Sequence, residues 1–159
     1  MIYVLILFGV IFIDQLTKIL VASQGAGWNV TIIPEVFSLT YTKNTGAAFS
    51  FLSDAEWGQL FFFILTIIIL PVLFVVFLKL DNNKKWLKTT VILIIAGTIG
   101  NFIDRLVFKG VTDFIYVHFF ANFNVADIAL TVGAIMLIFY FLFLDADCLI
   151  PIKKKVKNG

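Results

Sequence analysis

The sequence is poor in the residues that build disulfides, metal sites and nucleophilic triads. Its 159 residues include one cysteine, Cys148, and one histidine, His118. A single cysteine excludes an internal disulfide and a thiolate metal cluster, and no second histidine is there to complete a zinc motif. His118 would be the only histidine base for a triad, so we interpret it as an aromatic side chain at a membrane interface. We expect neither a metal nor another cofactor.

Charge is also scarce. Lys, Arg, Asp and Glu make up 14% of the chain, and the formal net charge is +2. So small a charge, with lysines near the ends of apolar segments, makes nucleic acid an unsuitable partner. Hydrophobic residues account for 61% of the sequence, more than a soluble domain of this length can bury. The composition therefore indicates a membrane protein.

Four stretches are long enough to cross a bilayer, which takes about 20 mostly apolar residues. They cover about residues 2–21, 60–78, 87–108 and 125–144. The first stretch lacks a basic leading segment and contains Asp14 and Lys18, so we do not expect it to be a cleaved signal peptide. The predicted fold class is an all-α membrane protein with four transmembrane helices, in a single integral-membrane domain over residues 1–159.

Lysine placement predicts the orientation. Lysines gather between the second and third spans and in the C-terminal tail, at Lys79, Lys84, Lys85, Lys88, Lys153, Lys154, Lys155 and Lys157. Four spans bring both segments to one side, and the positive-inside rule makes that side cytoplasmic. Both termini are then cytoplasmic, and the first loop, about 22–58, is extracytoplasmic.

The polar residues of the spans converge on the extracytoplasmic leaflet. A helix rises about 1.5 Å per residue, so Asp14 falls in the outer half of the first span. The others end the third span or begin the fourth: Asn101, Asp104, Arg105, Asn124 and Asp127. Ionisable residues are costly at such depths, and their presence indicates a functional site.

Helical spacing suggests partners for some of these groups. Asp14 and Lys18 stand four residues apart and predict a buried structural ion pair. Asp104 and Arg105 are most simply paired charges that fix the third helix against its neighbours. The planar guanidinium also leaves substrate binding open. Gly97 and Gly100 make the third helix slim enough for close helix approach.

The first loop contains a strand signal. Phe37, Leu39 and Tyr41 alternate with polar residues, which predicts a small amphipathic β element on the outer membrane surface. Asn44, taken alone, is typical of a turn. The aromatic-rich segment 115–122 is expected at the interface.

Asp113 and Asp127 have no cation at helical spacing, and the topology brings both to one membrane face. Two close carboxylates cannot both ionise cheaply, so they share a proton. That state supplies a base to activate water and an acid to polarise a carbonyl. The pair predicts acid–base hydrolysis.

Two other classes of function stay open on these residues alone. In a proton-coupled transporter, membrane carboxylates relay protons, although such sites usually lie near the midplane between structural repeats. Here the carboxylates lie near one face, and no repeat is visible. In a non-enzymatic assembly factor, the polar residues would only hold helices together.

Five ordered segments carry a family resemblance. They are 13–18 (IDQLTK), 44–49 (NTGAAF), 100–105 (GNFIDR), 111–114 (VTDF) and 123–127 (FNVAD). Together they resemble the bacterial lipoprotein signal peptidases, the signal peptidase II family. The resemblance implies an intramembrane aspartic endopeptidase of the bacterial cytoplasmic membrane. Its substrates would be diacylglyceryl-modified prolipoproteins, cleaved just before the lipidated cysteine.

The resemblance also implies roles for individual residues. Asp113 and Asp127 correspond to the catalytic pair. Five residues would orient substrate or the carboxylates: Asn44, Gly46, Asn101, Arg105 and Asn124. Asp14, Lys18 and Asp104 would be structural or supporting. The implied fold adds a small extracytoplasmic β-cradle from the first loop and a short helix-like segment near Ile115, with membrane lipids around it, no cofactor and no required oligomer.

Overall fold

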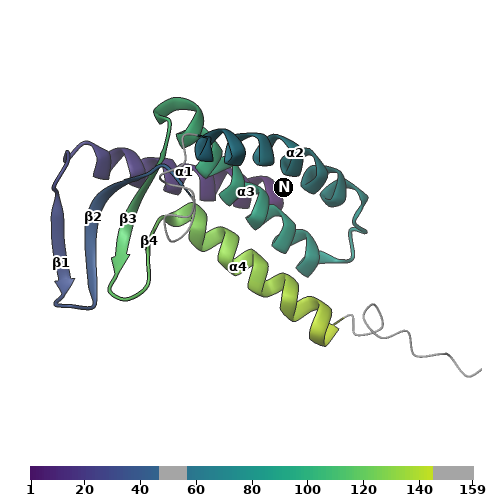
Figure 1. Ribbon diagram of the computed structural model, residues 1–159. Coiled ribbons are helices and arrows are strands. Elements are labelled where there is room, and N and C mark those ends of the chain that lie inside the picture. The colour runs from purple at the N-terminus through teal and green to yellow at the C-terminus, as the bar shows by residue number, and fades with distance from the viewer. Residues whose placement is uncertain (47–56, 145–159) are drawn as a thin grey trace, which may run out of the picture.

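The computed structural model describes residues 1–46 and 57–144. The predictions that concern Cys148, residues 47–49 and the C-terminal lysines lie outside the described residues. Four helices form the body of the molecule (Figure 1). They are α1 (Ile2–Ala22), α2 (Gly58–Lys79), α3 (Lys85–Phe108) and α4 (Val125–Phe139), which a π-helical turn continues over Tyr140–Leu144. By length and composition, all four are long and apolar enough to cross a membrane, and their ends lie within about two residues of those of the predicted spans.

Helix α3 is the most buried of the four. Its side chains Val91, Ile92 and Ile95 form a buried apolar cluster, against which α1 and α2 pack. Most large apolar side chains of α1, α2 and α4 are instead exposed. Such an outward-facing apolar surface fits a protein whose solvent is lipid rather than water.

Close approach between α3 and α4 depends on glycine. A Cβ built on Gly97 would run into the backbone carbonyl oxygen of Ala126, and one on Gly133 would lie 2.6 Å from Ile94 Cγ1. A Cβ on Gly100 would lie 2.6 Å from a carboxylate oxygen of Asp14. The predicted role of Gly97 and Gly100 in close packing is confirmed.

A four-stranded antiparallel sheet lies at one end of the helices, with its strands running across the helix axes (Figure 1). Its order is β1 (Asn29–Ile33), β2 (Phe37–Asn44), β3 (Val111–Val117) and β4 (Asn122–Phe123). The strand predicted from the 37–42 alternation is confirmed as part of β2. The first loop, however, supplies only half of the sheet, because β3 and β4 come from the link between α3 and α4.

The expectation of a short helix-like segment near Ile115 is wrong. Ile115 lies in the middle of β3, where it pairs with Leu39 on one side and Phe123 on the other. Two neighbouring strands satisfy the backbone groups of this segment, and its β-branched and aromatic residues suit a pleated surface. Tertiary partners that the local sequence does not reveal therefore decide its conformation.

The register between β2 and β3 positions one of the key carboxylates. Asp113 pairs with Thr42, and Val111 pairs with Asn44. The ladder is irregular between Leu39 and Thr42, as at a β-bulge, a feature that redirects side chains. The first four residues of β3 are buried, so Asp113 lies between the sheet and the helices.

Candidate active site

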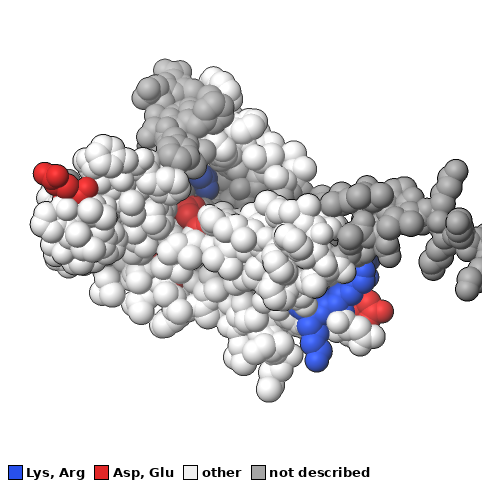
Figure 2. All heavy atoms as spheres, turned by 90° about the horizontal axis from the view of Figure 1, so that it is seen from below, with Lys and Arg blue, Asp and Glu red and all other residues white. Residues whose placement is uncertain are grey.

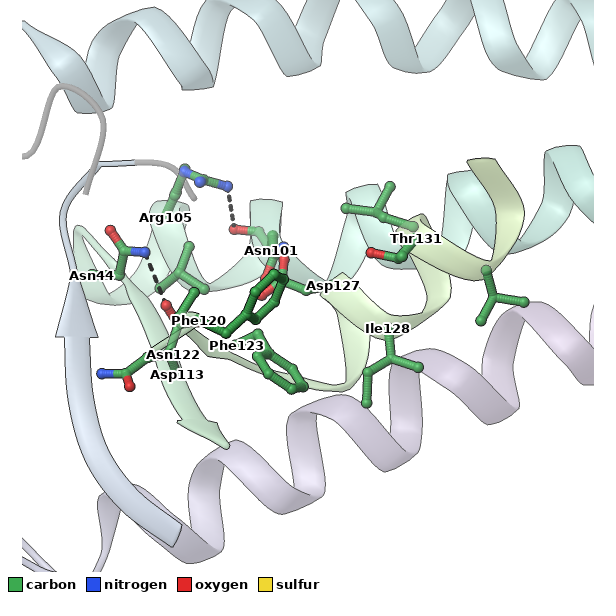
Figure 3. Close-up of a pocket in the computed structure, with 14 residues that line it drawn as sticks. Asn44, Asn101, Arg105, Asp113, Phe120, Asn122, Phe123, Asp127, Ile128 and Thr131 are labelled. Atoms are coloured by element: carbon green, nitrogen blue, oxygen red, sulfur yellow. Dashed lines mark hydrogen bonds between the residues drawn. The ribbon is translucent and has the colours of Figure 1, made fainter. Parts of the chain in front are cut away.

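The structure brings Asp113 and Asp127 to one cavity of about 530 Å³ (Figure 3). Asp113 comes from β3, and Asp127 from the first turn of α4. Other polar residues of the wall include Asn44, Asn101 and Arg105. The apolar part of the wall consists of Val111, Phe120, Ala121, Phe123, Ile128, Leu130 and Val132.

Asp113 is 2% exposed, and both of its carboxylate oxygens accept hydrogen bonds. Asn124 Nδ2 donates to Oδ1 at 2.7 Å, and Asn44 Nδ2 donates to Oδ2 at 2.9 Å. Burial raises the pKa of Asp113 to about 6, and the nearby negative charge of Asp127 adds to the rise. The two asparagine hydrogen bonds act in the opposite direction by stabilising the ionised form.

Asp127 is held by a helix cap and by a side chain of α3. Its Oδ2 accepts from the backbone N–H of Asn124 at 3.2 Å, and its own N–H donates to Asn124 Oδ1 at 2.9 Å. These reciprocal bonds form a capping box at the start of α4. Asn101 Nδ2 donates to the other carboxylate oxygen, Oδ1, at 2.7 Å.

The amides of the three asparagines are fixed in orientation. In each, the oxygen accepts from a group that can only donate: the N–H of Gly46 for Asn44, the ammonium of Lys18 for Asn101, and the N–H of Asp127 for Asn124. A flipped amide would direct N–H groups at a donor. The amide nitrogens must therefore face the two aspartates, and Asn124 contacts both of them.

Arg105 reaches backbone carbonyls. Its Nη1 donates to the carbonyl of Asn101 at 3.3 Å and its Nη2 to that of Gly46 at 3.4 Å, while the guanidinium lies 5.4 Å from the centre of the Phe62 ring. The cation that pairs with Asp104 is not Arg105, as the sequence suggested, but Lys18 of α1, whose Nζ lies 3.5 Å from Asp104 Oδ2. Although Asp104 and Arg105 are adjacent in sequence, Asp104 contacts α1 through Lys18, whereas Arg105 contacts the segment after β2 through the carbonyl of Gly46.

The predicted ion pair between Asp14 and Lys18 is confirmed, with Nζ 2.8 Å from Oδ2. Asp104 joins it, so that one ammonium lies between two carboxylates in a cluster whose side chains are 0–3% exposed. Gln15 also donates to Asp14 at 3.1 Å and to Asp104 at 3.0 Å. We refer to Asp14, Lys18 and Asp104 as the Lys18 cluster.

Sequence reasoning missed the apolar half of the cavity. Phe120 and Phe123 come from the β3–β4 region, and Ile128 and Val132 from one face of α4. The spacing of Ile128 and Val132, four residues apart and following Asp127, was a signal that could have been used. His118 is not among the cavity residues; its Nδ1 lies 3.2 Å from the Tyr116 hydroxyl.

The fold and the site define a multi-pass membrane protein with paired, amide-held carboxylates at one end of its helices. A family model described as signal peptidase (SPase) II matches residues 6–143. The chain is 43% identical to the lipoprotein signal peptidase of Pseudomonas putida, over 80% of this chain and 79% of that one. It is 37% identical to the lipoprotein signal peptidase of Listeria monocytogenes, over 88% and 92%.

A solved bacterial membrane enzyme, 35% identical, superposes with a TM-score of 0.81 over 99% of this chain and 93% of the other. The chain belongs to the signal peptidase II family. Membership confirms the resemblance seen in the sequence and the expectation of a membrane-bound aspartic peptidase of this type. It sets aside the transporter and assembly-factor interpretations.

Proposed function

We propose that this chain removes signal peptides from diacylglyceryl-modified prolipoproteins, cutting just before the lipidated cysteine, with Asp113 and Asp127 as the catalytic pair. Family membership supports the class of substrate. The observation that carries the assignment of residues is the position of Asn124, whose side-chain amide donates to the Asp113 carboxylate and whose backbone N–H donates to the Asp127 carboxylate. Both carboxylates are thereby held against one cavity.

The pair activates water. Because burial raises the pKa of Asp113 to about 6, a singly protonated pair is accessible near neutral pH. The ionised carboxylate takes a proton from a water molecule, whose oxygen attacks the scissile carbonyl carbon, while the protonated carboxyl hydrogen-bonds the carbonyl oxygen. The tetrahedral intermediate then breaks its C–N bond as a proton passes from the pair to the leaving nitrogen. No acyl-enzyme forms.

The two halves of the cavity have different tasks in this scheme. Asn44, Asn101 and Asn124 hold the carboxylates, while Arg105 and Gly46 orient the substrate backbone. The apolar half accepts the diacylglyceryl chains, which enter sideways from the outer leaflet. The proposal requires no oligomer, because both aspartates and the three asparagines that hold them belong to this chain.

The proposed location is the bacterial cytoplasmic membrane, with both termini cytoplasmic and the cavity near the extracytoplasmic face. Lysine placement supports it: Lys79, Lys84 and Lys85 are exposed and lie at or between the adjoining ends of α2 and α3. That end of the helices lies away from the sheet (Figure 1), and Figure 2 shows a group of basic side chains there. The sheet and the cavity then face outward. We treat the chain as one integral-membrane domain.

Replacing each carboxylate tests the catalytic pair. Asparagine nearly matches aspartate in shape but cannot hold the shared proton, so Asp113→Asn and Asp127→Asn should each lower kcat by at least about 10³-fold. The double variant should be no worse than either single one, because the pair acts as a unit. Peptide release from a lipidated prolipoprotein is the measurement.

Asp81→Asn is the matched control, because Asp81 is exposed and lies in the α2–α3 link at the opposite end of the bundle. It should cleave like the wild type. Near-wild-type turnover by either pair variant would show that the aspartic mechanism is wrong and would make Asp104 the next candidate.

A further inference from the structure

The contacts of the Lys18 cluster lead to the backbone immediately before each proposed catalytic aspartate. Asp14 Oδ1 accepts from the N–H of Ala126 at 2.8 Å, and Ala126 precedes Asp127. Asp104 Oδ2 accepts from the N–H of Thr112 at 2.9 Å, and Thr112 precedes Asp113. One buried cluster therefore holds both chain segments that carry the pair.

A third contact reaches the side chain of Asp127 itself. Lys18 Nζ donates to Asn101 Oδ1 at 3.0 Å, and Asn101 Nδ2 donates to Asp127 Oδ1 at 2.7 Å. Lysine can only donate, so it dictates which end of the Asn101 amide faces the carboxylate. Without the ammonium, the longer 3.2 Å bond from Asn124 Nδ2 to the same oxygen would be left to hold the amide in this orientation.

These bonds are more specific than charge neutralisation in a membrane requires. Lys18 and one acid would suffice for a structural ion pair, yet the cluster contains a second acid, and each acid accepts a backbone N–H. Hydrogen bonds to charged groups are shorter and stronger than neutral ones. In a buried setting they fix the distance between β3 and the first turn of α4.

We propose that the Lys18 cluster positions the catalytic pair, with Lys18 acting through Asn101 and the two acids acting through the backbone of Ala126 and Thr112. Lys18 is a positioning residue: it is not among the residues that line the cavity. This inference rests on the proposed function, since it assigns a task relative to Asp113 and Asp127. It goes beyond the structural role expected from the sequence.

Lys18→Met is the first test, because it keeps the length of the side chain and removes the ammonium. Displacements of about 1 Å at a reacting centre can cost about 100-fold in rate, so kcat should fall by about that factor. KM for the lipidated prolipoprotein should stay within about twofold, since substrate contacts are unchanged. In an Asn101→Ala background, Lys18→Met should cause a clearly smaller loss of kcat than in the wild type, because the route through the amide to Asp127 is already broken and only the contacts of Lys18 with the two acids remain to be lost.

Ile92→Ala is the matched control for stability. Ile92 lies in the apolar cluster of α3, α1 and α2 and is not among the cavity residues. The substitution should lower Tm and leave kcat of the folded protein unchanged. A loss of kcat in Lys18→Met at a Tm no lower than that of Ile92→Ala supports positioning rather than structural damage.

Asp104→Asn provides a second variant if Lys18→Met yields no folded protein. It leaves the 2.8 Å pair between Lys18 and Asp14 in place and weakens the acceptor for the Thr112 N–H. We expect about a tenfold lower kcat with KM unchanged.

Wild-type kcat in folded Lys18→Met would overturn the proposal, as would an additive loss in the Asn101→Ala background or a change confined to KM. If Lys18→Met does not fold, wild-type kcat in folded Asp104→Asn overturns it. The variants Asp113→Asn and Asp127→Asn distinguish a failure of the proposed function from a failure of the positioning role. If they retain activity, the proposed function fails; if they are inactive while folded cluster variants cleave normally, only the positioning role fails.

Discussion

At the scale of single residues, the site depends on three neutral amides. Asn44, Asn101 and Asn124 present N–H groups to two carboxylates, of which Asp113 is buried and Asp127 is partly exposed. Amides stabilise the ionised form without contributing a charge, so they offset part of the cost of burial while leaving the pair able to exchange a proton. A lysine or arginine in their place would hold the carboxylates permanently ionised.

Stability of the folded protein should depend on pH through Asp113. Burial raises its pKa from 3.8 to about 6, so the folded state binds this proton more tightly than the unfolded state does. Stability is then highest below the unfolded pKa and falls as pH rises through 6, by about 3 kcal/mol in all. We expect the Tm of the wild type to decline between pH 4 and pH 8, and Asp113→Asn to show a shallower decline.

Thermal unfolding in lipid nanodiscs across this range is the measurement. The quantity to compare is the slope of Tm against pH rather than Tm at one pH, since asparagine also alters the hydrogen bonds at this position. Asp81→Asn should keep the wild-type slope. An unchanged slope in Asp113→Asn would contradict the raised pKa.

The polar residues of this site could be named from the sequence, but most of the contacts between them could not. The spacing of Asp14 and Lys18, four residues apart on a helix, predicts their ion pair. Asp113 and Asp127 could be singled out because neither has a cation at helical spacing. The contact between Lys18 and Asn101 spans 83 positions. Amide orientation depends on such distant donors, and no local pattern encodes it.

At the scale of elements, the position of α4 is set by how closely α3 allows it to approach. A Cβ on Gly97 would meet a backbone carbonyl of α4, a group that cannot turn aside as a flexible side chain can. That carbonyl belongs to Ala126, so the contact lies one residue from Asp127. Helix packing and site geometry are therefore coupled at this point.

Gly97→Ala should destabilise the protein and impair cleavage. Overpacking a close contact typically costs about 1–3 kcal/mol, and the displaced start of α4 would carry Asp127 with it. Gly9→Ala on α1 is the matched control, because a Cβ built there would have no neighbour within 4 Å apart from the adjacent residues and the backbone of its own helix. Tm and cleavage rate in nanodiscs are the measurements, and equal values for the two variants would contradict the close-contact argument.

Elements differed in how well the sequence revealed them. The four helices could be predicted from long apolar segments, because such segments are rare in soluble proteins and the thickness of the bilayer sets their length. Strand β2 was visible in the alternation of Phe37, Leu39 and Tyr41. Strand β3 was not, because residues 111–117 show no alternating pattern and acquire their partners only from β2 and β4.

At the scale of the whole molecule, the helices connect two ends of opposite character. The sheet and the cavity occupy one end (Figure 1), and exposed basic side chains gather at the other (Figure 2). Lys43 and Lys109 are exposed near the sheet, so the two ends differ in how many lysines they carry, with Lys79, Lys84 and Lys85 at the far end. If the lysine-rich end is cytoplasmic, as the positive-inside rule predicts, the cavity lies at the extracytoplasmic face, where we propose that cleavage takes place.

Cysteine labelling tests the orientation. With Cys148 replaced by serine, a cysteine at Glu35, in the exposed turn between β1 and β2, should react with an impermeant maleimide in intact cells or spheroplasts. A cysteine at Asn82, exposed in the α2–α3 link, should react only after permeabilisation. Labelling of Asn82→Cys from outside would invert the proposed arrangement.

Selectivity for lipidated substrate tests the sideways entry. Each buried CH₂ group contributes about 0.8 kcal/mol, so burying even four of them would favour the lipidated precursor by about 200-fold in kcat/KM. We expect an unlipidated precursor to be cleaved at least about 100-fold less efficiently. Equal efficiency for both precursors would contradict a lipid-binding role for the apolar half of the cavity, although not the catalytic pair.

The pairing of β2 with β3 also has a consequence for biogenesis. Strand β2 precedes the second span, and β3 follows the third, so the two strands can meet only after two further helices have been synthesised and inserted. Asn44 reaches Asp113 through this pairing. In the orientation proposed above, the site is complete only after both segments of the sheet have been translocated. We therefore expect the nascent chain to gain activity toward a neighbouring membrane protein only at the end of its own assembly.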